Sequence, residues 1–308
     1  MSEILKGLRF LKGHGTENDF VIVPDPDGLI DLPPALVARL CDRRAGVGGD
    51  GLLRVVRSAA HPEAAPMAAE AEWFMDYRNS DGSVAEMCGN GLRVFARYLV
   101  LAGLAGSGDL AVATRAGVLG VHVAADGPDG PSGVTVEMGR ARLPGPADVL
   151  VTVGERQWPA THVNMGNPHA VAFVDDLDHA GDLFAAPGVA PATAYPTGVN
   201  VEFVVDRGPR HLAMRVHERG SGETRSCGTG ACAVAVAAAR RDGVDPALTG
   251  QPVTYTVDLP GGRLVVTEQV DGAVRMTGPA VVLAEGVLDA SWLGGRQDWT
   301  GTGAGLAR

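Results

Sequence analysis

The stretch Glu218-Arg219-Gly220-Ser221-Gly222-Glu223-Thr224-Arg225-Ser226-Cys227-Gly228-Thr229-Gly230 carries a glycine-rich turn into the start of a helix. The residues that follow, 231–239, are almost all alanine and valine, so a buried helix is expected there. Cys227 then stands at a helix N-terminus, where free backbone N–H groups and the positive end of the helix dipole favour a thiolate or a bound anion. The turn therefore predicts a cysteine that can ionise or that lies beside a bound anion.

The chain contains a second copy of this element. Met87-Cys88-Gly89-Asn90-Gly91 precedes the helical pattern of residues 92–99. Two copies of one element in one chain predict two similar halves that face a shared site. Because most connections between the expected strands are too short for a parallel crossover, we predict an α+β fold of mostly antiparallel sheets with one principal helix in each half.

Composition limits the classes of function. The chain has 308 residues, 45% hydrophobic and 20% charged, and a net charge of −10. It has no cluster of Lys and Arg, which argues against nucleic acid or an anionic membrane as a partner. Residues 1–8 have no apolar core long enough for a signal peptide, and no apolar run approaches the roughly 20 residues of a membrane helix.

Cysteine is sparse, and its pattern indicates a reducing compartment. The four cysteines are Cys41, Cys88, Cys227 and Cys232, and none of their spacings matches a zinc site or a disulfide scaffold. Cys41 and Cys232 lie within helical patterns among apolar neighbours and are interpreted as small buried hydrophobes. We therefore expect a cytoplasmic protein whose thiols are reduced.

Strand and turn patterns fill the rest of the chain. Strands are expected at residues 9–12, 20–23, 52–56, 72–78, 111–114, 117–123, 134–138, 149–153, 158–163, 169–174, 199–205, 211–216, 253–257, 262–266 and 273–276, with a helix at 35–42. Residues 59–71 are interpreted as a solvated excursion, 126–133 as a linker, and the glycine-rich residues after Trp292 as disordered. The glycine run 46–51 lacks the Lys-Ser/Thr ending of a phosphate-binding loop.

Two matched thiols point to stereoinversion. Inverting a carbon centre by deprotonation needs a base on one face and an acid on the other, and these roles exchange in the reverse reaction. A helix N-terminus stabilises a thiolate by at most about 2 kcal/mol, or roughly 1.5 pKa units. That effect predicts a substantial thiolate fraction near neutrality, and the pair is expected to hold one proton between its two members.

The backbone N–H groups at Gly89-Asn90 and Gly228-Thr229 can hold a substrate carboxylate between the two helix ends. No lysine stands in a recognisable pyridoxal-phosphate context and no metal-ligand cluster is evident, so we expect a reaction without a cofactor. Two alternatives remain at this point. The cysteines could be inert and buried, or they could form a redox dithiol.

At these residues the sequence resembles the diaminopimelate epimerase family, part of the cofactor-independent epimerase and racemase superfamily. The resemblance covers nearly the whole chain, and its motifs are Asn18-Asp19-Phe20, Asn79-Ser80-Asp81-Gly82-Ser83, Cys88-Gly89-Asn90-Gly91, Gly166-Asn167-Pro168-His169, Gly198-Val199-Asn200-Val201, Glu218-Arg219-Gly220 and Cys227-Gly228-Thr229-Gly230. Asn79 precedes Cys88 by the same nine residues that separate Glu218 from Cys227. Such a set in this order is highly specific.

The resemblance implies interconversion of LL- and meso-2,6-diaminoheptanedioate, a step toward lysine and peptidoglycan precursors. It implies that Cys227 is the base and Cys88 the acid in one direction. It also implies a set of substrate contacts, which are Asn18, Asn79, Gly89, Asn90, Asn167, Asn200, Glu218, Arg219, Gly228 and Thr229. Within this set Arg219 and the asparagines would hold the distal carboxylate and Glu218 an ammonium group. His169 is expected to be auxiliary, and a racemase of a cyclic amino acid is the alternative within the class.

Family members fold as two related halves, each a mostly antiparallel sheet wrapped around a central helix, with the active site in the cleft between them. For this chain that implies residues 1–132 with Cys88, joined by residues 283–308, and residues 133–282 with Cys227. Family habit also implies a homodimer. Two residues depart from the family pattern, which often has Gly where this chain has Glu17 and Gln where it has Gly51.

Overall fold

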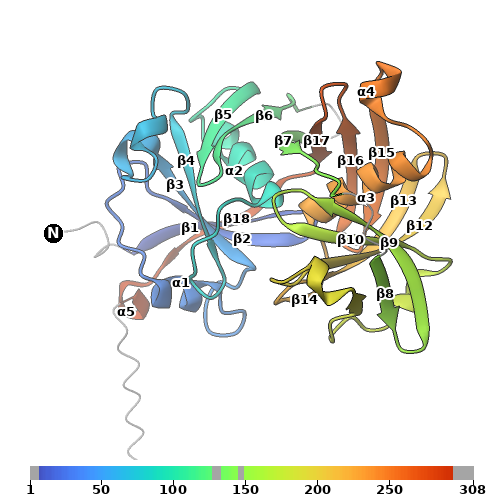
Figure 1. Cartoon of the computed structure of the whole chain (residues 1–308). Coiled ribbons are helices and arrows are strands. Elements are labelled where there is room, and N and C mark those ends of the chain that lie inside the picture. The colour runs from blue at the N-terminus through green and yellow to red at the C-terminus, as the bar shows by residue number, and fades with distance from the viewer. Residues whose placement is uncertain (1–6, 127–132, 145–148, 294–308) are drawn as a thin grey trace, which may run out of the picture.

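The computed structural model describes residues 7–126, 133–144 and 149–293. Two similar halves lie side by side, and each is a sheet curved around one long helix (Figure 1). The first half contains strands β1 (Leu8–Gly15), β2 (Asn18–Pro24), β3 (Gly51–Arg57), β4 (Trp73–Asn79), β5 (Gly108–Thr114), β6 (Gly117–Val123) and β7 (Val134–Arg140). Its helices are α1 (Pro34–Cys41) and α2 (Gly89–Leu101).

The second half has more strands and shorter helical turns. Its strands are β8 (Val149–Val153), β9 (Arg156–Asn164), β10 (Pro168–Phe173), β11 (Gly188–Ala190), β12 (Asn200–Gly208), β13 (His211–Glu218), β14 (Gly222–Thr224), β15 (Val253–Leu259), β16 (Gly262–Glu268) and β17 (Ala273–Gly278). Its helices are α3 (Gly228–Arg241) and α4 (Pro246–Thr249). The chain then runs through β18 (Val281–Leu288) and α5 (Ala290–Leu293).

Strand pairing repeats between the halves. From the junction outward, the first half runs β7, β6, β5, β4, β3, β2, β1, β18, and the second runs β17, β16, β15, β13, β12, β10, β9, β8. In both series the third and fifth pairings are parallel and the other pairings are antiparallel. This match establishes the pseudo-symmetric, mostly antiparallel fold that the two cysteine elements predicted.

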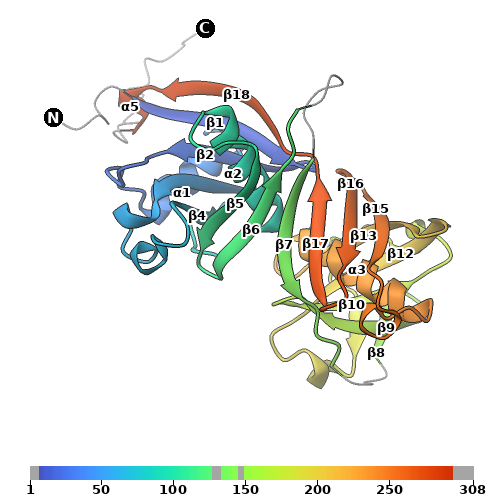
Figure 2. The same cartoon turned by 90° about the horizontal axis from the view of Figure 1, so that it is seen from above.

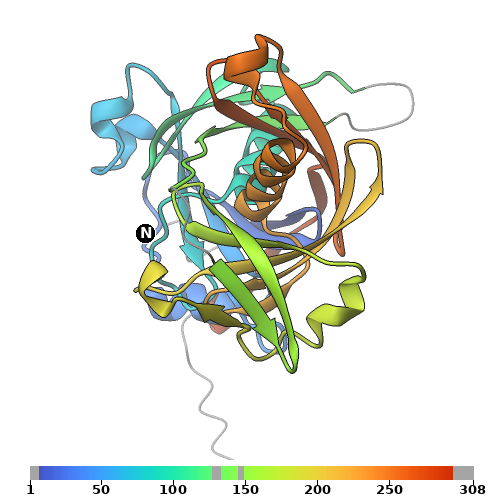
Figure 3. The same cartoon turned by 45° about the vertical axis from the view of Figure 1, so that its right-hand side comes forward.

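Each central helix connects two parallel strands, as a crossover must. Helix α2 joins β4 to β5, and α3 with α4 leads from the β13–β14 hairpin to β15. The buried faces of α2 and α3 belong to one hydrophobic core that extends through both halves. Figure 3 shows the two helices enclosed by the surrounding strands. The apolar residues that follow each cysteine therefore anchor the helix starts inside the molecule.

The halves join along one strand pair, and the last strand of the chain returns to the first half. Strand β7 pairs with β6 on one side and with β17 on the other. After β17 the chain crosses back, and β18 pairs antiparallel with β1 (Figure 2). The predicted division near residue 132 remains a proposal. It would place β7 in the second half, whereas the repeated strand order groups β7 with the first. Residues 127–132, and the tail from residue 294, lie outside the described residues.

The interpretation of residues 59–71 as a solvated excursion holds for most of the segment, which is exposed, but it is wrong for the residues that pack inward. Ala64 and Ala71 are buried and belong to a small apolar cluster with Phe74 and Ala113. His61 from the same segment stacks on Phe74, with ring centroids 4.7 Å apart. Small alanine side chains gave little apolar signal in the sequence, yet they fit closely against the outer face of β4. No helix in the described part of the chain is long and apolar enough to cross a membrane.

Candidate active site

Cys88 is the N-cap of α2, as its sequence context predicted. Its backbone is extended (φ −139°, ψ 116°), and its Sγ accepts a hydrogen bond from the Gly91 N–H at 3.4 Å. The thiol donates to Asn18 Oδ1 at 3.6 Å. The sulfur therefore takes the place that a Ser or Asp oxygen occupies in an ordinary helix cap.

Cys227 repeats this geometry at the start of α3. Its backbone is again extended (φ −116°, ψ 110°), and its Sγ accepts from the Gly230 N–H at 3.3 Å. Thr229 Oγ1 lies 3.5 Å from the same sulfur. Both thiols thus lie against free N–H groups at the positive end of a helix dipole.

The first turns of the two helices meet at the junction of the halves. A Cβ built on Gly89 would lie 2.8 Å from Met138 Sδ and 2.9 Å from Met276 Cε, and one on Gly228 would lie 3.2 Å from Met276 Sδ and from Asn90 Oδ1. Met276 therefore packs against both helix starts. A side chain at Gly89 would require Met138 and Met276 to move, and one at Gly228 would require a smaller movement of Met276 and Asn90.

Asn90 ties the two cysteine loops together. Its Nδ2 donates to Asn18 Oδ1, to Ser226 O and to Ser226 Oγ, each at 3.2 Å. Ser226 Oγ lies 2.6 Å from Thr16 Oγ1. Asn90 Oδ1 is buried and has no hydrogen-bond partner. Sequence reasoning missed Ser226 and Thr16, although Ser226 directly precedes Cys227.

Asn167 and His169 form a second set of contacts beside Cys227. Asn167 Nδ2 donates to Thr229 Oγ1 at 3.3 Å, and its Oδ1 lies 3.0 Å from His169 Nε2. His169 Nδ1 lies 2.6 Å from Glu202 Oε1, and both side chains are fully buried. The auxiliary His169 is therefore linked to the Cys227 thiol through Asn167 and Thr229. Sequence reasoning missed Glu202, which gives no motif signal.

Glu218 is the charged group that faces both thiols. Its carboxylate accepts from Thr224 Oγ1, and its proximity helps raise the pKa of Cys88 and of Cys227. Burial raises the pKa of Glu218 itself, and hydrogen bonds from Thr224 and Cys227 oppose that effect. His169 acts in the same direction as those hydrogen bonds.

The thiols themselves are harder to ionise than their position predicted. Burial raises the pKa of Cys88 to about 11, and it raises the pKa of Cys227 well above its usual value. The N–H groups at Gly91 and Gly230 act in the opposite direction. The expectation of substantial thiolate near neutrality is therefore wrong for this arrangement, because loss of water outweighs a helix end worth at most about 2 kcal/mol.

The side chains of Asn79, Asn200 and Arg219, which were expected to contact the substrate, hydrogen-bond elsewhere than at the two thiols. Asn200 is buried and its Oδ1 accepts from the Arg219 backbone N–H at 2.9 Å. The exposed Arg219 guanidinium donates to Thr197 O at 2.9 Å. Asn79 Nδ2 donates to Ser83 Oγ at 2.9 Å, within its own turn. Asn79 thus stays within its own turn, whereas Arg219 is tied to the segment that leads into β12.

The two departures from the family pattern have local explanations. A Cβ on Gly51 would lie 2.8 Å from Tyr77 Cε2 and 2.6 Å from Arg78 O, so Tyr77 fills the space a longer side chain would need. Glu17 has a positive φ of 61°, a backbone conformation that favours glycine. Its carboxylate pairs with Arg225, which links the first loop to the Cys227 turn.

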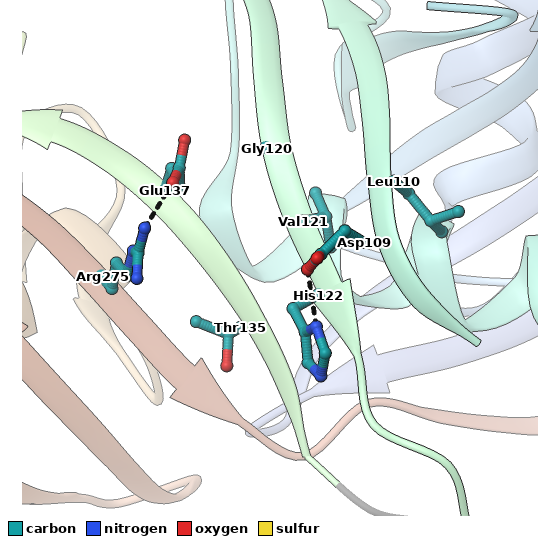
Figure 4. A pocket seen from close by; sticks show the side chains of 8 residues that line it. All are labelled: Asp109, Leu110, Gly120, Val121, His122, Thr135, Glu137 and Arg275. Atoms are coloured by element: carbon teal, nitrogen blue, oxygen red, sulfur yellow. Dashed lines mark hydrogen bonds and ion pairs between the residues drawn. The ribbon is translucent and has the colours of Figure 1, made fainter.

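A groove on the outer surface lies between β5–β6 and β7–β17, away from the thiols (Figure 4). It encloses about 500 Å³. Its charged side chains pair with one another, His122 with Asp109 at 2.7 Å and Arg275 with Glu137 at 3.1 Å. The charged groups of this groove already pair with one another, and it contains no cysteine. We therefore do not assign the catalytic site to it. Among the described residues, no group of His, Cys, Asp and Glu has an arrangement that could hold a metal ion.

Curated relatives extend over almost the whole chain. The diaminopimelate epimerase of Streptomyces coelicolor is 76% identical over 288 residues, which are 94% of this chain and 98% of that protein. The diaminopimelate epimerase of Thermobifida fusca is 50% identical over 93% of this chain and 100% of that protein.

Solved structures with low sequence identity have the same fold. A phenazine biosynthesis protein of the PhzF family from Bacillus anthracis matches with a TM-score of 0.66 at 16% identity, covering 91% of this chain and 98% of that one. A hydroxyproline epimerase from Agrobacterium vitis matches with a TM-score of 0.61 at 14% identity, covering 91% and 92%. The family model described as diaminopimelate epimerase matches residues 10–144 and 161–283. With the two capped thiols and these relatives, the chain belongs to the diaminopimelate epimerase family.

Proposed function

We propose that this protein interconverts LL- and meso-2,6-diaminoheptanedioate by a two-thiol reaction that needs no cofactor. The observation that carries the proposal is that Cys88 and Cys227 cap two helices whose first turns meet. Identity of 76% to a diaminopimelate epimerase supports the substrate. The reaction belongs to lysine and peptidoglycan precursor synthesis.

In the proposed reaction one sulfur is a thiolate and the other a thiol. In one direction the Cys227 thiolate takes the α-proton, so the C–H bond breaks and an S–H bond forms, and the electron pair moves into the adjacent carboxylate. Cys88 then gives its proton to the opposite face of the carbon. The carbon ends with inverted configuration and the two sulfurs have exchanged states, so the reverse reaction uses the same groups in exchanged roles.

Burial suits this chemistry once a thiolate forms. A thiolate whose conjugate acid has a high pKa is a stronger base, and an amino-acid α-proton is a weak acid. Free N–H groups at Gly89, Asn90, Gly228 and Thr229 would receive the carboxylate on which negative charge grows. Both effects lower the barrier at the step where the C–H bond breaks.

The remaining contacts would recognise the non-reacting end of the substrate. Arg219, Asn79, Asn167 and Asn200 are proposed to hold the distal carboxylate, and Glu218 an ammonium group. Among the described residues, the Glu218 carboxylate forms no ion pair with an arginine or lysine, and it lies close to both thiols, which supports that assignment. A cyclic amino acid such as proline has no distal ammonium and carboxylate to fill these positions.

We further propose a cytoplasmic homodimer. All four cysteines are free thiols, which supports a reducing compartment. Leu283 and Val287 on β18 are exposed, at 56% and 65%, and β18 pairs only with β1 among the described strands. An apolar strand edge of this kind is a suitable surface for a second copy. Light scattering of the wild type and of Leu283→Lys tests the assembly.

Proton NMR of LL-diaminoheptanedioate in D₂O with the purified protein tests the function. We expect the α-proton signal to disappear while the meso isomer forms, with no cofactor added. Cys88→Ala and Cys227→Ala are each expected to abolish this. If the α-proton of proline exchanges and that of the diamino acid does not, the proposed substrate is wrong. If no amino acid exchanges its α-proton, the result favours a redox or structural role for the thiols.

A further inference from the structure

The side-chain amide of Asn18 connects the Cys88 thiol to a carboxylate. Its Oδ1 accepts from the Cys88 thiol, with oxygen and sulfur 3.6 Å apart, and its Nδ2 donates to Asp50 Oδ2 at 2.8 Å. The end of the amide that faces Cys88 matters chemically. A carbonyl oxygen beside the sulfur favours the S–H form, whereas an N–H group there would favour a thiolate. The orientation of this amide therefore influences the protonation state of Cys88.

Asp50 fixes that orientation from one end. A carboxylate paired with an arginine only accepts hydrogen bonds, and Asp50 Oδ1 accepts from Arg43 Nη2 at 2.7 Å. Its other oxygen accepts from the Asn18 amide and from the Asp19 backbone N–H, the latter at 3.2 Å. With the amide reversed, the Asn18 carbonyl oxygen would face an oxygen that cannot donate to it. The Asp50 carboxylate therefore selects the orientation in which Asn18 Nδ2 points toward it.

Backbone and ionic contacts hold Asp50 in this place, although its side chain is partly exposed. Asp50 directly precedes β3 and Asn18 begins β2, and these two strands pair in parallel. The Asp50 N–H donates to the Asp19 backbone oxygen at 2.8 Å, so residues 19 and 50 hydrogen-bond in both directions. Arg43 also donates to both oxygens of the Asp19 carboxylate, at 2.6 and 3.0 Å. The acceptor for Asn18 is therefore fixed relative to β2.

Asn90 fixes the same orientation from the other end. The backbone oxygen of Ser226 can only accept, so it sets the direction of the Asn90 amide that donates to it. The same Asn90 Nδ2 donates to Asn18 Oδ1 at 3.2 Å. Two groups that only accept hydrogen bonds, the Asp50 carboxylate and the Ser226 carbonyl, thus give one consistent direction to the amides between them. Both place the Asn18 carbonyl oxygen on the side of Cys88.

We propose that Asp50 is a positioning residue, which holds the Asn18 amide with its carbonyl oxygen toward Cys88 and thereby holds the Cys88 proton in a hydrogen bond. In the direction in which Cys227 takes the α-proton, Cys88 then keeps the proton that it gives to the opposite face of the carbon. In the reverse direction, the acceptor beside the Cys88 thiolate makes the sulfur a stronger base. This inference rests on the proposed function only in treating Cys88 as a reacting thiol.

Infrared spectroscopy of the S–H stretching band tests the proposal. The Cys88 band is assigned in each protein by subtracting the spectrum of the same protein with Cys88→Ala. A hydrogen bond to an oxygen lowers the S–H frequency, so we expect the wild-type band below that of Cys232, which lies in the hydrophobic core. In Asp50→Leu, which offers Asn18 no oxygen, the band should rise toward that of Cys232. The rate of Cys88 alkylation by iodoacetamide at pH 9 should increase about 5-fold, because a hydrogen bond to the protonated form is lost.

Two further variants separate the orientation of the amide from other effects. Asp50→Asn keeps one oxygen for Asn18 and removes the negative charge, so its Cys88 band should stay close to the wild type. Arg43→Met is the matched control, because it breaks the ion pairs of Asp19 and Asp50 in the same loop and leaves the acceptor of Asn18 in place. Its Cys88 band should also stay unchanged.

A Cys88 band that does not move in Asp50→Leu would overturn the proposal. An equal shift in Arg43→Met would show that packing of the loop controls the thiol, and an equal shift in Asp50→Asn would show that charge does, so either result also overturns it. If Asp50→Leu does not fold, the wild-type spectrum decides, and a Cys88 band at or above the Cys232 frequency overturns the proposal. The spectra need no substrate, so they fail independently of the epimerase assignment.

Discussion

Asn90 Nδ2 lies 3.2 Å from the backbone oxygen of Ser226 and 3.2 Å from its hydroxyl, which joins two residues that belong to different halves. Asn90 follows Cys88 by two positions, and Ser226 directly precedes Cys227. This contact fixes how far apart the two cysteine loops lie. In the proposed reaction, the alignment of the two thiols therefore depends on one buried amide.

Asn90→Ala should lower kcat about 100-fold, because misplacing reacting groups by about 1 Å has an effect of that size. Ser226→Ala should cost less than about 5-fold, since the Asn90 amide still donates to the Ser226 backbone oxygen. Steady-state kinetics with LL-diaminoheptanedioate measure both. An Asn90→Ala enzyme with more than half of the wild-type kcat would show that the contact does not align the thiols.

Gly89→Ala should abolish measurable epimerisation and leave the protein folded. The added methyl would lie 2.8 Å from Met138 and 2.9 Å from Met276, and displacing those methionines disturbs the packing against Gly228. Overpacking of this kind costs about 1–3 kcal/mol. Gly106→Ala is the control, because the methyl added there would have no heavy atom within 4 Å. Activity and thermal unfolding are measured for both, and an active Gly89→Ala enzyme would refute the close approach.

Arg219→Met should raise KM for the diamino diacid about 10-fold or more with a smaller change in kcat, because it removes a charge-assisted contact with the distal carboxylate. An amino acid without that carboxylate should bind the wild type and the variant equally well. Arg207→Met, another exposed arginine of the same half, serves as the control. An unchanged KM in Arg219→Met would move the distal site elsewhere.

The raised pKa of Cys88 links stability to pH. A thiol with a pKa of about 11 in the folded state and about 8.5 in the unfolded chain binds its proton more tightly when folded. Its contribution to the free energy of unfolding is therefore complete below about pH 8.5 and is lost as the pH rises toward 11. Urea denaturation at pH 7.5 and 10 should show a larger loss for the wild type than for Cys88→Ala. Equal losses would mean that the thiol titrates normally.

Oxidation should inactivate the protein reversibly. The helix starts that carry Cys88 and Cys227 meet, so we expect an oxidant to join the two sulfurs and remove both proton-transfer groups. Dithiothreitol should restore the activity. Full epimerase activity in a form whose Cys88–Cys227 disulfide is confirmed by mass spectrometry would contradict the two-thiol mechanism and favour the redox alternative.

Local patterns were sufficient to predict the elements that carry the thiols. The Cys-Gly-polar-Gly steps predicted two helix caps because the turn and the apolar helix that follows are encoded within a few residues. The repeat of that step predicted two halves, and the alternating apolar patterns predicted most of their strands but not β11, β14 or β18. These features depend on interactions between neighbours in sequence.

What sequence reasoning missed depends on distant parts of the chain. Thr16 and Ser226 acquire their roles only when both halves are in place, and Glu202 only when β12 pairs with β10 beside His169. All three residue types are common in turns and strands. The pKa of Cys88 was misjudged because burial in the folded chain raises it, and a local pattern does not report that burial. Ala64 and Ala71 were misplaced because small side chains can fill a surface cluster without a periodic pattern.

The return of β18 to β1 has a consequence for synthesis on the ribosome. Strand β1 is made first, and the strand that covers its outer edge is the last one made. The first half therefore cannot complete its sheet until the whole second half has emerged, even though the Cys88 loop was translated long before. Completion of this enzyme during translation is set by its final strand, and a chain that ends before Val281 leaves the edge of β1 open.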